Sequence, residues 1–187
     1  MKKLASYCAA ILSGLLFSSV AFAWGSTGHR LLAEQGMTIL SPATLSNCKI
    51  TIQEMMDHTT DPDEIWRQQR MKHPHEAEAH LFHVDRQPKN WRELNEAKDR
   101  SQGYLVYRII TWTEEAKKLR AAGKWDELKE NLYGLSHYLG DLSQPMHLHH
   151  DYDGKGVDLP GIHSQFESKM INRYKIEVRS ALKISLQ

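Results

Sequence analysis

The spacing of apolar side chains follows a helical period in almost every segment of the chain. The clearest stripe lies between Trp125 and Leu142 and recurs at intervals of three and four residues. It consists of Leu128, Leu132, Leu135, Leu139 and Leu142. Runs that alternate apolar and polar positions, as a half-buried strand would, are scarce. The pattern therefore predicts an all-α protein built from several helices.

Further helices are predicted on both sides of this stripe. Ser41-Pro42 and Asp61-Pro62 each place a capping side chain before a proline, which is typical of a helix start. Residues 76–82 are expected to form a short helical or extended piece. Longer helices are expected over residues 26–39 and 101–122, and from about His163 towards the C-terminus.

The first 23 residues have the composition of a secretory signal peptide. Lys2 and Lys3 precede a mostly apolar stretch, and Ala21-Phe22-Ala23 fits a cleavage site of the A-x-A type. The apolar stretch is too short and too often interrupted by serine for a membrane span. We therefore expect cleavage after Ala23 and a secreted or periplasmic protein. The remaining residues 24–187 have the length of one domain.

The composition of the predicted mature chain narrows the classes of function. Two of the 24 Lys and Arg residues lie in the first 23 residues, which leaves 22 basic against 23 acidic residues. This balance excludes a protein that holds nucleic acid by bulk charge alone, but not a nuclease whose metals bind the phosphate. Only Cys48 remains, so no internal disulfide can form, whereas all 11 histidines are retained. The composition therefore favours a metal-dependent protein.

The segment from His137 to His147 concentrates residues that bind metals. His137 and Asp141 are four residues apart and project from one face of a helix. Pro145 breaks that helix, so His147 can turn towards a second metal. Imidazole and carboxylate groups form a zinc-type ligand set. From periodicity alone, this face fits either the solvent side of an amphipathic helix or a metal site that Gly134 allows the backbone to approach.

Four other segments carry further donor groups. Cleavage after Ala23 would expose the α-amine of Trp24, a usable nitrogen ligand, and its carbonyl oxygen could chelate the same ion. In this interpretation the Trp24 side chain is incidental. The other donors are Asp61 and Asp63 at a predicted helix start, His80 and His83 in one short run, and His163 and Glu167 on one helical face.

Together these segments resemble the superfamily of zinc-dependent phospholipase C and the S1/P1 nucleases. The His-Tyr-x-Gly-Asp-x-x-Gln-Pro-x-His pattern of residues 137–147 carries most of the resemblance. Trp24-Gly-x-x-Gly-His29 resembles the nuclease branch. His163-Ser-x-x-Glu167 resembles the phospholipase branch, because the nucleases usually end this motif in aspartate. The resemblance implies an all-α secreted enzyme with three zinc ions and a ligating N-terminal tryptophan.

The resemblance also implies a ligand set for each zinc ion. The first ion takes Asp63, His80, His137 and Asp141. The second takes His147, His163 and Glu167. The third takes the Trp24 amine and carbonyl, His29 and a shared Asp141. Two alternatives stay open, because His83 could replace His80 and Asp61 could replace Asp63.

The activity that the resemblance implies is hydrolysis of phosphate esters with a zinc-bound hydroxide. Asp63 is the candidate catalytic residue that orients or deprotonates the water. Gln144-Pro145-Met146-His147 and the His163…Glu167 ending favour a phospholipase C that acts on phospholipids, with peripheral membrane contact. The alternative substrate is nucleic acid, cleaved by an S1/P1-type single-strand nuclease or 3′-nucleotidase. No protein partner is implied.

Two departures from the superfamily pattern define a third hypothesis. Leu148-His149-His150-Asp151 follows His147, where phospholipases have a small residue or proline and then asparagine. The chain also ends 20 residues beyond Glu167, before the further helices expected in relatives. The third hypothesis is therefore a truncated, inactive zinc-binding module. His149 and His150 are expected to be loop residues near the cleft.

Overall fold

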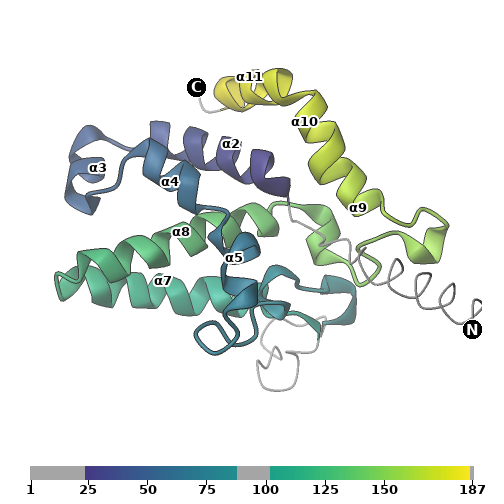
Figure 1. Cartoon of the computed structure of the whole chain (residues 1–187), viewed down its shortest axis with the longest axis horizontal. Coiled ribbons are helices and arrows are strands. Elements are labelled where there is room, and N and C mark those ends of the chain that lie inside the picture. Colours follow the sequence, from purple (N-terminus) through teal and green to yellow (C-terminus); the bar gives the residue numbers. More distant parts are fainter. Residues whose placement is uncertain (1–23, 88–101, 186–187) are drawn as a thin grey trace, which may run out of the picture.

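The computed structural model describes residues 24–87 and 102–185, and within them the chain is helical with no strand (Figure 1). One isolated antiparallel bridge joins Phe82 to Gly103. Helices α7 (Leu105–Ala121) and α8 (Trp125–Leu142) run side by side, and α2 (Gly25–Thr38) packs against α8. The prediction of an all-α fold is confirmed. The predicted signal peptide, residues 1–23, lies outside the described residues.

Three short helices follow α2, and two of them begin where the sequence predicted. Helix α3 spans Pro42–Cys48, α4 spans Ile52–His58 and α5 spans Asp61–Glu64. Thr51 and Glu54 form a reciprocal capping box at the start of α4, which satisfies two backbone N–H groups. Helix α4 packs on α2 and α8 through one apolar cluster. It contains Ala33, Met37, Ile50, Met55 and Tyr133.

A second apolar cluster lies between the α7–α8 pair and the irregular chain that leads to it. This chain contains single 3₁₀ turns η1 (Trp66–Gln68), η2 (Glu78–His80) and η3 (Val84–Arg86). Of the piece predicted over residues 76–82, only Glu78–His80 is helical. The cluster consists of Trp66, Ala79, Phe82, Leu105 and Tyr138. The two clusters flank the segment of α8 that carries His137.

The C-terminal part forms an arm of consecutive helices that packs against α2 (Figure 1). After η6 (Pro145–Leu148) and η7 (Lys155–Val157), α9 (Ile162–Ser164) leads directly into a π-helical segment, η8 (Gln165–Met170). Helices α10 (Ile171–Arg173) and α11 (Lys175–Ser185) follow. The continuous helix predicted from His163 is therefore widened at Glu167 and interrupted at Tyr174, and π-helical segments frequently mark functional sites.

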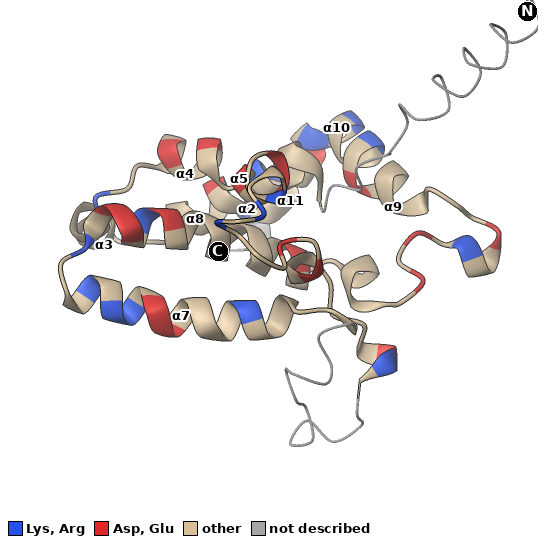
Figure 2. Ribbon diagram, turned by 60° about the horizontal axis from the view of Figure 1, so that its bottom comes forward, with Lys and Arg blue, Asp and Glu red and all other residues tan. Residues whose placement is uncertain are grey.

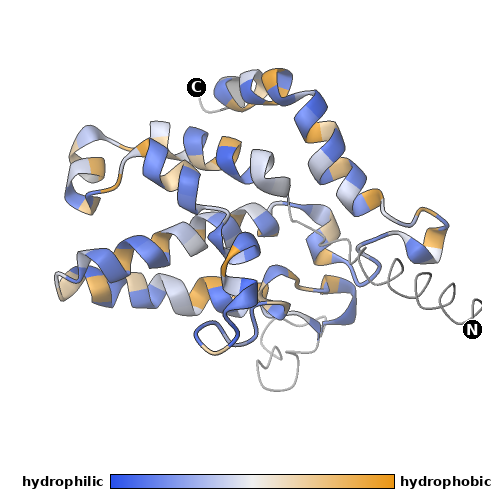
Figure 3. Cartoon of the chain, viewed as in Figure 1, coloured by the Kyte–Doolittle hydropathy of each residue, from blue (hydrophilic) through white to orange (hydrophobic). Residues whose placement is uncertain are grey.

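Basic and acidic residues are interspersed along α2, α7, α8 and α11, whereas α4 and α5 carry acidic residues alone (Figure 2). Hydrophobic and hydrophilic residues alternate along the helices (Figure 3). Within residues 24–87 and 102–185, no helix has the length and apolar character needed to cross a membrane.

Candidate metal centre

The face of α8 opposite the leucine stripe is the most deeply buried part of the helix. His137, Tyr138 and Asp141 have no exposed surface, whereas Leu139 of the predicted stripe is 52 % exposed. The interpretation of this polar face as the solvent side of the helix is therefore wrong. His137 Nδ1 lies 2.9 Å from the Thr59 carbonyl oxygen, which accepts its proton and leaves Nε2 facing Asp141.

Gly134 does not bring the backbone of α8 close to the buried His and Asp groups. A Cβ atom at this position would lie 2.3 Å from the Trp112 ring and 2.8 Å from the Trp66 ring. The missing side chain thus makes room for the Trp66 indole of the second apolar cluster and for the Trp112 indole that packs against this cluster. The glycine that faces a metal-binding side chain is Gly140, whose Cβ would lie 2.8 Å from His29 Nδ1.

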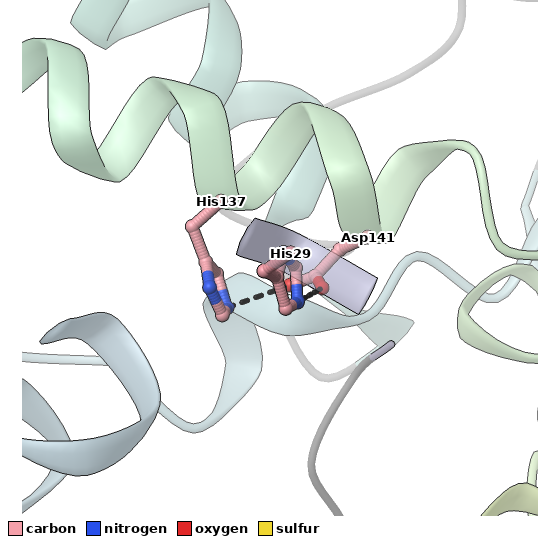
Figure 4. Close-up of side chains that lie close together, drawn as sticks. All are labelled: His29, His137 and Asp141. Atoms are coloured by element: carbon pink, nitrogen blue, oxygen red, sulfur yellow. Dashed lines mark ion pairs between the residues drawn. The ribbon is translucent and has the colours of Figure 1, made fainter. Parts of the chain in front are cut away.

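Asp141 is the meeting point of histidines from four segments of the chain. Its carboxylate lies 3.2 Å from His29 Nε2, 2.9 Å from His80 Nδ1 and 3.4 Å from His137 Nε2. His147 Nδ1 is 4.0 Å away. Figure 4 shows His29 and His137 converging on this carboxylate. Their rings are stacked, with 3.9 Å between centroids.

Asp63 and His80 complete this side of the cluster. Asp63 is buried, with its carboxylate 3.7 Å from His80 Nδ1 and 3.8 Å from His137 Nε2. Asp61, the alternative candidate to Asp63, instead forms an ion pair at the surface, with its Oδ2 atom 2.9 Å from His58 Nδ1. His83, the rival of His80, is not among the groups that converge on Asp141. The structure thus places Asp63 and His80 in the cluster, and Asp61 and His83 outside it.

His147, His163 and Glu167 form an adjacent buried group. The Glu167 carboxylate lies 3.2 Å from His147 Nε2 and 2.6 Å from His163 Nε2, and these two nitrogens are 3.0 Å apart. His147 Nδ1 donates to the carbonyl oxygen of His80, which turns Nε2 towards Glu167. This hydrogen bond also links the His147–His163–Glu167 group to the segment that supplies His80 to the group around Asp141.

Trp24 lies against the end of α8 beside Asp141. Its indole N–H donates to the carbonyl oxygen of Gly140 at 2.8 Å, and its ring packs on Phe166. The side chain is therefore an anchor, and the expectation that it is incidental is wrong. The Trp24 carbonyl oxygen accepts the N–H of Gly28 at 3.1 Å, which begins α2 and positions His29.

The charges of the cluster are strongly coupled. Burial alone would lower the pKa of His137, but attraction to Asp141 and Asp63 outweighs it and raises this pKa to about 9. Burial opposes ionisation of Asp141, yet His137 and His147 hold its pKa well below the ordinary value. Burial and the nearby charge of His137 lower the pKa of His29. Metal cations bound at the cluster could replace the protons that its histidines carry.

The buried donor groups are better suited to binding a metal ion than to forming hydrogen bonds with one another. Several fully buried atoms have no hydrogen-bond partner within the described residues, and such orphans are rare in proteins. They include His29 Nδ1, His163 Nδ1 and Glu167 Oε2. Three buried triads have donors close enough to share an ion. They are His29–His137–Asp141, Asp63–His80–His137 and His147–His163–Glu167. Nitrogen and carboxylate donors of this kind suit zinc.

Four residues beside the cluster were given no role in the sequence-based ligand sets, although Tyr138 and Gln144 belong to the motif of residues 137–147. Arg67 Nη2 lies 2.8 Å from Asp63 Oδ1, and Glu76 Oε1 lies 3.2 Å from His80 Nε2. Tyr138 donates to Glu76 at 2.7 Å, and Gln144 donates to Glu167. For Arg67 and Glu76, the available sequence signal was a spacing of four residues, from Asp63 to Arg67 and from Glu76 to His80.

A small cavity opens beside the buried groups. Its volume is about 140 Å³. It is lined by Arg67, Ala77, His80, Leu81, His147, Tyr152 and His163. Both halves of the cluster therefore border the same cavity, and a cation, Arg67, stands at its edge.

A helical fold with three buried triads of His and carboxylate side chains, two of which share His137, is the architecture of the zinc-dependent phosphoric ester hydrolases that include phospholipase C and P1 nuclease. The sequence model of the S1/P1 nuclease family matches residues 24–179, and the chain belongs to this family. No curated protein and no solved structure is detectably similar to the chain. The protein is thus a zinc-dependent hydrolase of phosphodiester bonds, from a family whose members are typically secreted.

Proposed function

We propose that the protein is a secreted nuclease that hydrolyses single-stranded nucleic acid and 3′-nucleotides with three zinc ions. The observation that carries the proposal is the convergence of His29, His80 and His137 on the single buried carboxylate of Asp141. The match to the S1/P1 nuclease family moves the preference from phospholipid, which the sequence motifs favoured, to nucleic acid.

The proposed ligand sets are those that the resemblance implied. One ion takes Asp63, His80, His137 and Asp141, and a second takes His147, His163 and Glu167. The third takes His29, Asp141 and the amine and carbonyl of Trp24. The distances of 2.6–3.8 Å between neighbouring donors support these groupings, because donors around one zinc ion lie roughly 3–3.5 Å apart.

The residues around the cavity have distinct roles in the proposed reaction. Zinc bound in such a cluster supplies a water of pKa about 7 and polarises phosphate oxygens. Asp63 orients the attacking water, and its contact with Arg67 leaves the guanidinium at the cavity edge. Arg67 is thus placed to neutralise a phosphate, which suits the planar fork of arginine. Glu76 orients His80 by its contact with the Nε2 atom of the ring, and Gln144 orients Glu167 by donating a hydrogen bond to its carboxylate.

The substrate class is tested by two assays on one preparation. Zinc-loaded protein that begins at Trp24 is incubated with single-stranded DNA and, separately, with phosphatidylcholine vesicles. We expect nucleotide release and no diacylglycerol. Asp141→Asn should abolish the activity, while His58→Ala, which alters an exposed His–Asp pair, should retain it.

Phospholipase C is the second candidate, because Glu167 ends its motif as in that branch. Diacylglycerol release without nucleotide release would establish phospholipase activity in place of the nuclease. Full zinc content with neither product would favour the inactive zinc-binding module.

The Trp24 ligand is tested by extending the chain by one residue. Retaining a methionine before Trp24 converts the amine into an amide nitrogen, which is a poor zinc ligand. We expect the loss of one zinc ion and most of the activity, measured by elemental analysis and nucleotide release. Unchanged zinc content would remove the N-terminal amine from the ligand set.

A further inference from the structure

A second group of metal-binding side chains lies at the surface, outside the buried cluster. Asp85 belongs to η3, and His149 and His150 directly follow η6. One donor atom from each of the three lies within 4.8 Å of the other two. We propose that Asp85, His149 and His150 form a peripheral site for a divalent transition metal, with zinc as its ion.

The backbone brings the two halves of this site together. The N–H of Phe82 donates to the carbonyl oxygen of His147 at 2.9 Å, which aligns the chain before η3 with the chain after η6. The N–H of His150 then donates to Asp85 Oδ1 at 3.0 Å. Asp85 and His150, which are 65 positions apart in the sequence, are thereby held next to each other. The backbone of the two segments therefore already brings the three side chains together.

The side-chain contacts leave donor atoms pointing at one place. His150 Nδ1 lies against Asp85 Oδ2, and His149 Nε2 is 3.9 Å from the same oxygen. The two imidazole rings are 4.8 Å apart between centroids. Two imidazoles and a carboxylate form a common zinc set that leaves positions open for water. Arg86 also lies 3.6 Å from Asp85, but it is 54 % exposed and can turn aside.

His83 lies near this site, but its nitrogens are not among the donor atoms that come within 4.8 Å of one another there. Its Nε2 atom is buried and has no hydrogen-bond partner within the described residues. Its side chain also makes a hydrogen bond with Gln102. The sequence offered His83 as the rival of His80 for the buried cluster, and the structure places it beside this surface site instead.

The peripheral site should be weaker than the buried cluster. The donors of His149 and His150 are exposed, and the Nδ1 atom of His149 accepts the N–H of Asp151 at 3.0 Å. This bond must be released when the ring becomes a ligand through Nε2, because a neutral imidazole offers one lone pair. The ion should therefore be removed by mild chelation that leaves the buried ions in place.

The site is tested by counting bound zinc after equilibrium dialysis at a fixed free zinc concentration. The wild type should hold one ion more per chain than either His149→Ala/His150→Ala or Asp85→Asn. His58→Ala is the matched control, because His58 and Asp61 form an exposed His–Asp pair without a third ligand. It should bind as much zinc as the wild type.

The count is a difference between variants, so it depends neither on the substrate nor on the number of buried ions. Nucleotide release by the two site variants should stay within about twofold of the wild type. Zinc content equal to that of the wild type in either variant would overturn the proposal. An equal loss of zinc in His58→Ala would also overturn it, because the binding would then be non-specific.

Discussion

A single methyl group added at Gly140 should weaken one metal site without disturbing the fold. The Cβ of Gly140→Ala would lie 2.8 Å from His29 Nδ1 and 3.0 Å from His29 Cε1. Ordinary contacts begin near 3.4 Å, so the ring must recede by about 0.6 Å. The ring is 1 % exposed and stacks on His137, so it has no open space into which it can move.

A displacement of this size matters because metal–ligand distances tolerate only about 0.2 Å. We expect zinc affinity at the His29 site to fall about 10–100-fold, which equals about 1.4–2.7 kcal/mol. Saturating zinc would therefore stabilise the variant less than the wild type by the same amount. For a chain of this length the melting temperature of the zinc-loaded protein should fall by roughly 3–10 °C relative to the control.

The control is Gly36→Ala in α2, where a Cβ would meet no atom within 4 Å. Both substitutions replace glycine by a better helix former, which contributes about 0.5–1 kcal/mol. Melting followed by circular dichroism, with zinc and with a chelator, separates the two effects. Without metal Gly140→Ala should already be the less stable variant, because its Cβ meets the His29 ring, and zinc should stabilise it less than it stabilises Gly36→Ala. If Gly140→Ala gains as much from zinc as Gly36→Ala, the assignment of His29 to the metal centre is refuted.

Three further predictions concern the support of the centre and of the fold. Gly134→Ala should lower the free energy of unfolding by about 1–3 kcal/mol, because the new Cβ overlaps the Trp112 ring; a melting temperature equal to that of the wild type would contradict this packing. Glu76→Gln should weaken zinc binding at His80 by about 10–100-fold with unchanged helix content, as measured by competition with a chelator; unchanged affinity would show that Glu76 does not orient the ring. Hydrogen bonds from Lys129 and Tyr133 lower the pKa of Glu54, so its contribution to stability is complete above the ordinary glutamate pKa of about 4.3 and is lost as the pH falls through the lower folded value. The difference in melting temperature between wild type and Glu54→Gln should thus shrink below that pH, and a constant difference would contradict the assignment.

Much of the site was predictable because its residues obey local spacing rules. His137 and Asp141, and likewise His163 and Glu167, are four residues apart and share a helical face in any helix that contains them. Pro145 ends the helix before His147 for a reason that is also local. The all-α fold could be read from periodicity in the same way.

Tertiary structure decided between candidates that the sequence left equal. Asp61 and Asp63 lie two residues apart on one short helix, and only packing against α8 places Asp63 inside and Asp61 at the surface. The sequence could not identify which face of α8 is buried, because a buried His–Asp face and a solvated face have the same polar pattern.

The sequence by itself determined the helical class, the donor types and their spacing within each segment. These properties depend on interactions over a few residues, so they can be recognised without knowing the fold. Only the tertiary structure decided that Asp141 lies among four histidines, that Gly134 makes room for indoles, and that Asp85 lies beside His149 and His150. Those outcomes depend on how distant segments pack, which no local periodicity encodes.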